Sequence, residues 1–163
     1  MKVILYQPQI PQNTGNIART CAVTGSELIL VRPLGFSTAS RHLKRAGLDY
    51  WKDTSVLEID DLEAYLETTK NPFCFFSSIA PSLYTQANYR PGHQLIFGSE
   101  TNGLPEMFWK KWPEHFYRIP MRPGARCLNL SCSVSIAVYE AYRQTIPRAG
   151  WFCEFGRCET TPN

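Results

Sequence analysis

Three polar stretches of the sequence carry residues that could bind an anionic or nucleotide-like ligand. The first is PQNTGNIAR, residues 11–19, which places Asn13, Gly15 and Asn16 ahead of Arg19. Free N–H groups at the start of a helix favour anions, and a guanidinium can hold a phosphate through two parallel hydrogen bonds. The stretch therefore predicts either a phosphate contact or an ordinary strand-to-helix turn with a surface arginine.

The second stretch is FGSETNGLP, residues 97–105, in which Gly98 and Gly103 flank four polar residues. Polar loops at the carboxyl ends of strands bind ligands in open α/β sheets, so this loop is either a candidate site or a plain turn. It lacks the Lys-Ser/Thr of a P-loop, and no GxGxxG occurs in the chain. These absences disfavour nucleoside triphosphate hydrolysis and dinucleotide binding.

The third stretch is IPMRPGARCLNLS, residues 119–131. Asn129 or Ser131 is placed to cap the helix that follows. Capping does not explain why Arg122 and Arg126 stand in the same loop. The apolar side chains of the stretch can wall a pocket: Met121, Cys127, Leu128 and Leu130.

Strand-like and helix-like segments alternate around these stretches. Several strand-like runs are apolar at consecutive positions, which is typical of strands covered on both faces in a parallel sheet. The order predicts a single-domain α/β fold, a parallel sheet flanked by helices. The expected strands are residues 2–7, 27–33, 55–59, 72–78, 94–100 and 115–121, and the expected helices are 14–25, 40–47, 59–70, 104–112 and 131–146.

Particular residues refine the ends and faces of the predicted helices. Asn13 or Thr14 is placed to cap the first helix, and Gly25 is placed to end it. Pro105 is expected near the first turn of residues 104–112, and Lys70 in the last turn of residues 59–70. The last helix carries one apolar stripe, which predicts packing against the sheet or a second subunit: Val134, Ala137, Val138 and Ala141.

Length and composition fit one compact domain. The chain has 163 residues, of which 44% are hydrophobic and 19% charged. No apolar run approaches the roughly 20 residues that span a bilayer, and the start of the chain does not read as a signal peptide. We therefore expect a cytoplasmic protein, with one domain over residues 1–147 and a C-terminal extension over 148–163.

The six cysteines form no CxxC pair, and no histidine is placed to complete a zinc site. In a cytosolic chain this favours free thiols and no metal, with Cys153 and Cys158 leaving a weaker alternative of a disulfide. His42, His93 and His115 are expected to be structural or surface residues.

The net charge of +3 is small, but the basic residues cluster. RHLKR, residues 41–45, is one cluster, and Arg118, Arg122 and Arg126 form a looser group. Each is either a solvated surface or a patch that faces phosphates.

Taken together and in this order, the motifs resemble those of the SPOUT RNA methyltransferases. PQNTGNIART, LIFGSETNGLP and IPMRPGARCLNLSCSVSIAVYEAYRQ are similar to the three signature motifs of that family. The similarity is strongest to the small tRNA 2'-O-methyltransferases that modify the ribose of the wobble nucleotide, position 34, when it is cytidine or a modified uridine. RHLKRAGLDYW, residues 41–51, matches that subgroup as well.

The resemblance implies a fold and a cofactor. It implies a homodimeric α/β fold whose C-terminal part threads a trefoil knot, a rare feature that hydrophobic periodicity does not reveal. It also implies S-adenosylmethionine, held by backbone and apolar groups next to the dimer seam. The matching cofactor-binding positions are Phe76, Gly98, Ile119, Cys127 and Leu128. At Cys127 relatives often carry a small polar residue.

By resemblance, Arg19 is the catalytic residue of the first motif. Arginine stays protonated at ordinary pH, so we interpret it as a clamp on the ribose oxygen and a neighbouring phosphate, with the phosphate or water taking the proton. The residues expected to position Arg19 and the ribose are Asn13, Glu100, Asn129 and Ser131.

RNA binding, by the same resemblance, involves the anticodon loop of tRNA. The residues expected to contact it are Arg41, Lys44, Arg45, Arg126 and Tyr139. Two alternatives stay open: 2'-O-methylation of another tRNA site or of ribosomal RNA, and an RNA-binding protein of this fold without methyl transfer.

Overall fold

The computed structural model describes residues 1–37 and 54–146. Within them, seven strands form one sheet in which every pairing is parallel. The strands are β1 (Lys2–Tyr6), β2 (Glu27–Val31), β3 (Val56–Ile59), β4 (Phe73–Phe76), β5 (Ser82–Leu83), β6 (Gln94–Phe97) and β7 (Phe116–Arg118). Their order across the sheet is β3-β2-β1-β6-β4-β7-β5.

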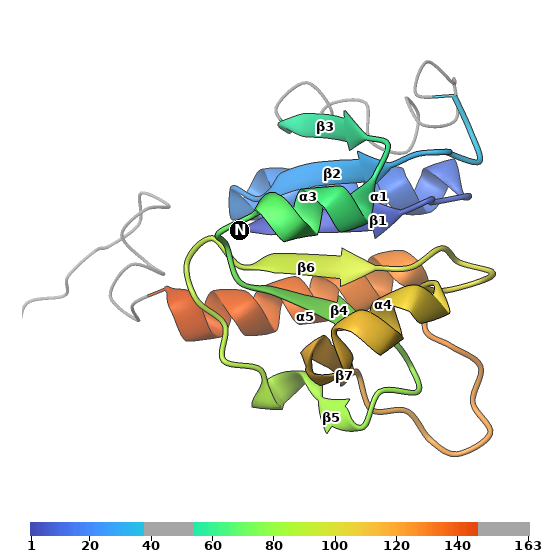
Figure 1. The fold of residues 1–163 in the computed structure, drawn as a ribbon, viewed down its shortest axis with the longest axis vertical. Coiled ribbons are helices and arrows are strands. Elements are labelled where there is room, and N and C mark those ends of the chain that lie inside the picture. The colour runs from blue at the N-terminus through green and yellow to red at the C-terminus, as the bar shows by residue number, and fades with distance from the viewer. Residues whose placement is uncertain (38–53, 147–163) are drawn as a thin grey trace, which may run out of the picture.

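Helices cover both faces of this sheet (Figure 1). The helices are α1 (Pro11–Thr24), α3 (Leu62–Thr68), α4 (Glu106–Lys111) and α5 (Leu130–Thr145), with short 3-10 turns at η1 (Tyr84–Gln86) and η2 (Pro113–His115). In Figure 1, α3 and α4 lie in front of the sheet, and α1 and α5 lie behind it. The arrows of β2, β3 and β6 point to the right in Figure 1, and every pairing is parallel, so the carboxyl ends of the strands share one edge.

Each face of the sheet has its own apolar core. Successive residues of a strand point to opposite faces, so Val3 and Leu5 pack with α1 and α5 while Ile4 packs with α3 and α4. Because both faces are covered, the strands are apolar at consecutive positions. The stripe predicted on the last helix is fully buried in the first of these cores: Val134, Ala137, Val138 and Ala141.

The predicted α/β fold is confirmed, and all six predicted strands are present with shorter bounds. The two-residue strand β5 was not predicted. The trefoil knot stays a prediction. The expected helix 40–47 lies outside the described residues.

Two predicted details of the helix ends are wrong. Helix α1 starts at Pro11, so Asn13 and Thr14 lie inside its first turn and neither caps it. Proline is pre-organised for the first helical position, which explains the earlier start. Lys70 lies beyond the end of α3, whereas Pro105 is the N-cap of α4 and so lies next to its first turn, as predicted.

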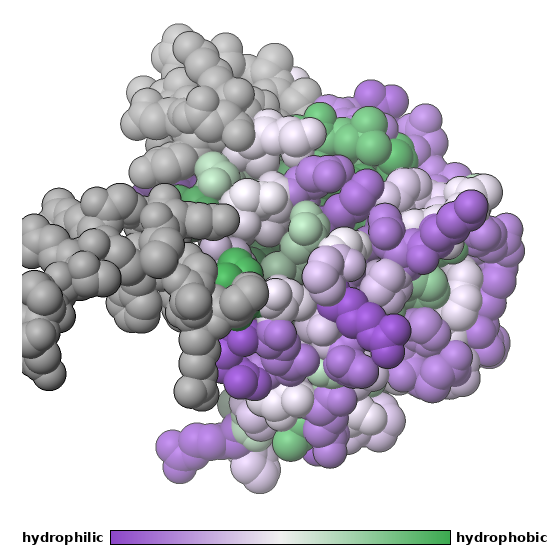
Figure 2. Space-filling view, turned by 90° about the vertical axis from the view of Figure 1, so that its left-hand side faces the viewer, coloured by the Kyte–Doolittle hydropathy of each residue, from purple (hydrophilic) through white to green (hydrophobic). Residues whose placement is uncertain are grey.

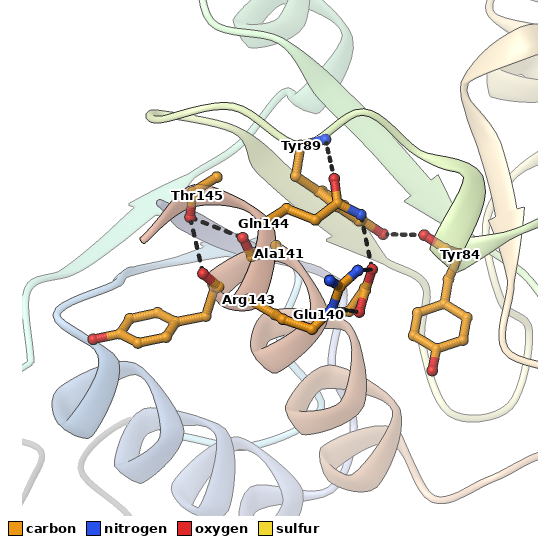
Figure 3. Close-up of polar contacts among 8 residues, drawn as sticks. Tyr84, Tyr89, Glu140, Ala141, Arg143, Gln144 and Thr145 are labelled. Carbon is orange, nitrogen blue, oxygen red and sulfur yellow. Dashed lines mark hydrogen bonds and ion pairs between the residues drawn. The ribbon is translucent and has the colours of Figure 1, made fainter. Parts of the chain in front are cut away.

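The C-terminal half of α5 is hydrogen-bonded to the segment between β5 and β6 (Figure 3). Gln144 accepts a hydrogen bond from the backbone N–H of Tyr89 at 3.1 Å and donates one to Glu140 at 2.8 Å. Glu140 also accepts two hydrogen bonds from Arg143, each of 2.8 Å, and these lower the pKa of the Glu140 carboxyl. The Tyr89 hydroxyl donates to the carbonyl oxygen of Tyr84 at 2.8 Å.

The edge at which the strands begin faces the viewer in Figure 2. Hydrophilic residues cover much of its described surface, and hydrophobic residues show there as separate patches. Among the described residues, no helix is long and apolar enough to cross a membrane.

His93 is buried at this edge beside Tyr89, with ring centroids 5.3 Å apart. Within the described part of the chain, neither ring nitrogen has a hydrogen-bond partner. Burial lowers the pKa of His93 to about 4, with smaller contributions from His115 and Arg90. A second proton on the ring is therefore unfavourable in the folded state.

We expect His93 to make stability depend on pH. The unfolded chain takes up a proton near the ordinary pKa of 6.5, whereas the folded chain does not until about 4. The free energy of unfolding should therefore be flat above pH ~7 and fall by about 1–2 kcal/mol by pH ~5. His93→Phe should remove most of this slope in urea unfolding experiments at the two pH values. An equally steep fall in the variant would contradict this role.

Candidate functional site

A cavity of about 520 Å³ opens where the loops after β1, β6, β4 and β7 meet. These four strands are neighbours in the sheet, so their carboxyl ends bring the four loops together. The neighbours β1 and β6 are far apart in sequence, and such reversals of strand order are where open α/β sheets bind ligands. The size lies within the range of small-molecule sites.

The cavity is lined by all five residues predicted to contact a cofactor: Phe76, Gly98, Ile119, Cys127 and Leu128. Three of the four predicted positioning residues line it as well: Asn13, Glu100 and Asn129. The lining thus combines an apolar wall from β4 and the 119–128 loop with a polar floor. Met121 and Leu130, predicted as wall residues, also line it.

The polar floor is a chain of hydrogen bonds that joins the three motifs. Glu100 Oε1 accepts from Asn13 Nδ2 at 2.9 Å, and Asn13 Oδ1 accepts from Asn129 Nδ2 at 2.9 Å. Asn129 Oδ1 in turn accepts from the backbone N–H of Ser131 at 2.9 Å, which confirms Asn129 as the N-cap of α5.

The direction of this chain is fixed at both ends. The start of α5 offers only N–H donors, so the oxygen of Asn129 must face it. The carboxylate of Glu100 can only accept, so the amide nitrogen of Asn13 must face it. Asn13 is 5% exposed, and a reversed amide there would leave buried groups unpaired at a cost of about 1–3 kcal/mol.

Glu100 is presented by a tight hairpin. Ser99 and Gly103 exchange two backbone hydrogen bonds of 3.1 and 3.0 Å, and Gly103 has φ +64°. A Cβ on Gly98 would lie 2.2 Å from the carbonyl carbon of Gly103. Glycine at position 98 is therefore required by close backbone approach within the protein, whatever else it contacts.

The backbone just before α1 already has an anionic partner. The backbone N–H groups of Gln9 and Ile10 both donate to the Glu100 carboxylate, at 2.8 and 3.2 Å. These donors are thus taken by an anion that the protein itself supplies.

Arg19 lies apart from the cavity. It lines a second, shallower hollow between α1 and α5, together with Asn16, Thr20, Ser131, Cys132, Ser135 and Ile136. Ser131, predicted to position Arg19, therefore shares this hollow with it. The α1–α5 contact is also bridged by the hydroxyls of Thr20 and Ser135, 3.1 Å apart.

Two more of the predicted residues, Tyr139 and Arg126, line neither hollow. Tyr139 is 49% exposed on α5, and Arg126 is exposed in the 119–129 loop. Arg41, Lys44 and Arg45 lie outside the described residues.

Several lining residues were missed by the sequence analysis. Ser77, Ser78 and Ile79 follow β4, and Trp109 reaches the cavity from α4. The Cys127 thiol donates to Ser78 Oγ at 3.5 Å, which ties the 119–128 loop to the β4 loop. The polar pair after a buried strand was the available signal for Ser77 and Ser78, whereas nothing in the sequence marked Trp109.

The described cysteines are free thiols, as predicted. Cys21 and Cys74 are buried in the core, and burial raises the pKa of the Cys21 thiol to about 12 and that of Cys74 as well. Cys127 and Cys132 are exposed near the two hollows. Among the described residues, no three His, Cys, Asp or Glu side chains are grouped to hold a metal ion.

The chain is similar in sequence to known RNA methyltransferases. The profile of the SpoU rRNA Methylase family matches residues 1–139. The tRNA (cytidine(34)-2'-O)-methyltransferase of Escherichia coli (strain K12) is 44% identical over 148 residues, which cover 88% of this chain and 93% of that protein.

Two solved methyltransferase structures are similar to this fold. One, described as giving structural insights into the 2-OH methylation of C/U34 on tRNA, superposes with a TM-score of 0.81 at 45% identity, covering 88% of this chain and 89% of the other. An AdoMet-bound rRNA methyltransferase from Sinorhizobium meliloti shares the fold, with a TM-score of 0.80 at 23% identity over 90% of this chain and 57% of its own. The chain therefore belongs to the SpoU rRNA Methylase family.

Proposed function

We propose that this protein transfers a methyl group from S-adenosylmethionine to the ribose 2'-hydroxyl of the wobble nucleotide of tRNA, position 34. The relatives named above support the reaction and the substrate. The observation that carries the proposal is the cavity at the carboxyl edge, because the three motifs meet there through one chain of hydrogen bonds. Since its substrate is tRNA, we place the enzyme in the cytoplasm. We also propose residues 1–147 as the catalytic domain and residues 148–163 as an extension.

The residues of the cavity fit the cofactor. Phe76, Ile119 and Leu128 offer an apolar wall for an adenosine, and the loop backbones beside them offer N–H and C=O groups that can read an adenine edge. Cys127 contributes through its backbone, because its thiol is turned to Ser78.

The chemistry asked of the protein is modest. When bound, S-adenosylmethionine supplies a methyl group on a positively charged sulfur that leaves as a neutral thioether. The protein must hold the 2'-oxygen in line with that methyl group and assist loss of the hydroxyl proton to water or a phosphate. Orientation of this kind can supply roughly 7–11 kcal/mol of the barrier. We assign Arg19 to the ribose oxygen and its neighbouring phosphate, because its guanidinium is a permanent cation.

We further propose that the enzyme acts as a homodimer through the outer face of α1 and α5. This face carries apolar side chains that are exposed in one chain: Val23 at 45%, Ile136 at 36% and Tyr139 at 49%. The hollow that holds Arg19 opens on the same face. A second subunit there would cover Val23 and Ile136, leave Tyr139 at the rim of the interface and enclose Arg19.

For RNA binding we propose the basic residues Arg41, Lys44, Arg45 and Arg126, with Tyr139 where it borders the dimer seam. Lysine and arginine contacts to phosphates give salt-dependent affinity. An anticodon loop suits such a platform because its unstacked bases can be splayed onto planar side chains.

The function is tested with the purified protein, S-adenosylmethionine and tRNA. Mass spectrometry of the digested tRNA should find a 2'-O-methyl group at position 34, and Arg19→Ala should lower turnover about 100-fold or more. The variant should bind S-adenosylhomocysteine as the wild type does in calorimetry, since Arg19 lies outside the cavity. Arg90→Ala, at the opposite edge of the sheet, is the matched control. A normal rate for Arg19→Ala would refute its role, and methylation elsewhere would refute the substrate.

The basic cluster is tested by Arg41→Glu combined with Arg45→Glu. The KM for tRNA should rise, and the slope of log KM against log salt concentration should flatten by about two, one for each lost phosphate contact. Lys70→Glu combined with Arg90→Glu makes the same change of net charge away from the site and should leave the slope nearly unchanged. Equal effects of the two double variants would argue against a local patch.

The dimer is tested by Ile136→Asp in analytical ultracentrifugation. A buried unpaired carboxylate at a subunit interface is strongly unfavourable, so this variant should sediment as a monomer and lose methyl transfer. Leu57→Asp changes another exposed apolar residue, on β3, and should leave the association state unaltered. A dimeric Ile136→Asp protein would place the interface elsewhere.

A further inference from the structure

Helix α1 begins without a local cap. Its N-cap is Ile10, which has no side chain to accept a hydrogen bond, and its first turn contains no acidic residue. Natural helices usually satisfy their first N–H groups with a nearby Ser, Thr, Asp or Asn. Here Glu100, from the hairpin after β6, accepts from the backbone N–H groups of Gln9 and Ile10, the two residues just before the helix. Glu100 and Ile10 are 90 positions apart in sequence.

The Glu100 carboxylate holds three donors at once. Its Oε2 accepts from the Gln9 N–H at 2.8 Å, and its Oε1 accepts from the Ile10 N–H at 3.2 Å and from Asn13 Nδ2 at 2.9 Å. A carboxylate at a helix start is also favoured by the helix dipole. Both oxygens are thus committed to the start of α1.

Other hydrogen bonds also restrain the turn that Glu100 holds. The Thr101 hydroxyl donates to Gln9 Oε1 at 2.9 Å, and the Gly35 N–H donates to the carbonyl oxygen of Pro8 at 2.9 Å. A Cβ on Gly35 would lie only 2.7 Å from the Cα atom of Gln9. The backbone of this turn therefore has little room to shift.

The same turn is strained. Gln7 has φ +48°, the only positive φ at a non-glycine residue in the described ranges 1–37 and 54–146. Side-chain-bearing residues avoid this region, and such outliers persist only where the surroundings enforce them. The hydrogen bonds from Gln9 and Ile10 to Glu100 help to hold Gln7 in this conformation.

We propose that Glu100 positions Arg19, the role that the family resemblance implies for it, by fixing the turn before α1, and that it is not the acceptor of the ribose proton. The carboxylate holds the backbone of Gln9 and Ile10 and the side chain of Asn13, and these three hydrogen bonds are called the clasp below. The clasp restrains the strained turn and so sets where the helix and its arginine lie. This inference rests on the proposed methyl transfer for its kinetic consequences, but the clasp is a property of the free protein.

Glu100→Gln is the sharpest variant, because it keeps the shape of the side chain and replaces one acceptor oxygen with a donor NH₂. That NH₂ must face either the Gln9 N–H or the Ile10 N–H and Asn13 Nδ2, so at least one contact becomes a donor–donor clash. Glu106→Gln, an exposed change on α4, is the matched control.

The first measurement is amide hydrogen exchange, which requires no ligand or activity. Exchange at Gln9 and Ile10 should be about 10-fold or more faster in Glu100→Gln than in the wild type or Glu106→Gln. Unchanged exchange in Glu100→Gln would show that the clasp does not restrain the turn and would overturn the proposal.

The second measurement is the dependence of kcat on pH. Glu100→Gln should lower kcat roughly 10- to 100-fold, as expected for a misplaced catalytic group, while the pH–rate profile keeps its shape. Adding Gln7→Gly, which relieves the positive φ, should recover several-fold of the lost kcat.

Other outcomes would overturn the assignment. Loss of the acidic limb of the pH–rate profile would make Glu100 the proton acceptor, and a wild-type kcat would remove it from the reaction. Weakened S-adenosylhomocysteine binding at unchanged kcat would make it a cofactor ligand. If the wild-type protein itself neither binds the cofactor nor methylates tRNA, the proposed function fails, and hydrogen exchange still decides the clasp.

Discussion

The site depends on one buried amide, that of Asn13, which joins a carboxylate to a helix start. Its nitrogen donates to Glu100 and its oxygen accepts from Asn129, each at 2.9 Å. The two partners are 87 and 116 positions away in sequence, yet each can bond in only one sense. An amide is the side chain that can serve an acceptor on one side and a donor on the other. Asn13 thus holds the three loops in one register without adding charge beside Glu100.

The parallel sheet makes this cross-link possible. Because β1, β6, β4 and β7 are adjacent and run the same way, their following loops must leave from the same edge. Loops at such an edge carry polar backbone groups that need partners. The hairpin after β6 bonds to itself through Ser99 and Gly103, and its Glu100 accepts from the backbone of the loop after β1. The cavity lies between the loops that these hydrogen bonds connect.

Much of the fold could be predicted from sequence because it rests on local, repeated signals. The strands are recognisable in the sequence as apolar runs because both faces of the sheet are covered. The apolar stripe from Val134 to Ala141 is the buried face of α5. Strand β5 was missed because two residues carry no period. The start of α1 was misplaced because Pro11 occupies the first helical position, where no N–H needs a cap. The turn before it is held by Glu100, an acceptor too distant in sequence for any local rule to find. The resemblance supplied the five lining residues that we propose bind the cofactor, whereas Trp109 reaches the cavity through tertiary packing alone.

The position of Arg19 sets the remaining constraint on the reaction. Asn13 and Arg19 stand on one helix, six residues apart, which at the rise of an α-helix separates them by about 9 Å. Asn13 lines the cavity, and Arg19 lines the hollow on the outer face. A ribose gripped by Arg19 and a methyl group held in the cavity must still come within bonding reach. Within one chain, the first turn of α5 stands between the two, with Ser131 on one side and Ser133 on the other. A second subunit on the outer face of α1 and α5 gives one way to meet this constraint, because it can bring the Arg19 of one chain towards the cavity of the other. On this reasoning the clasp at the start of α1 must be rigid, since an error in the helix would be carried across the interface to the reacting atoms.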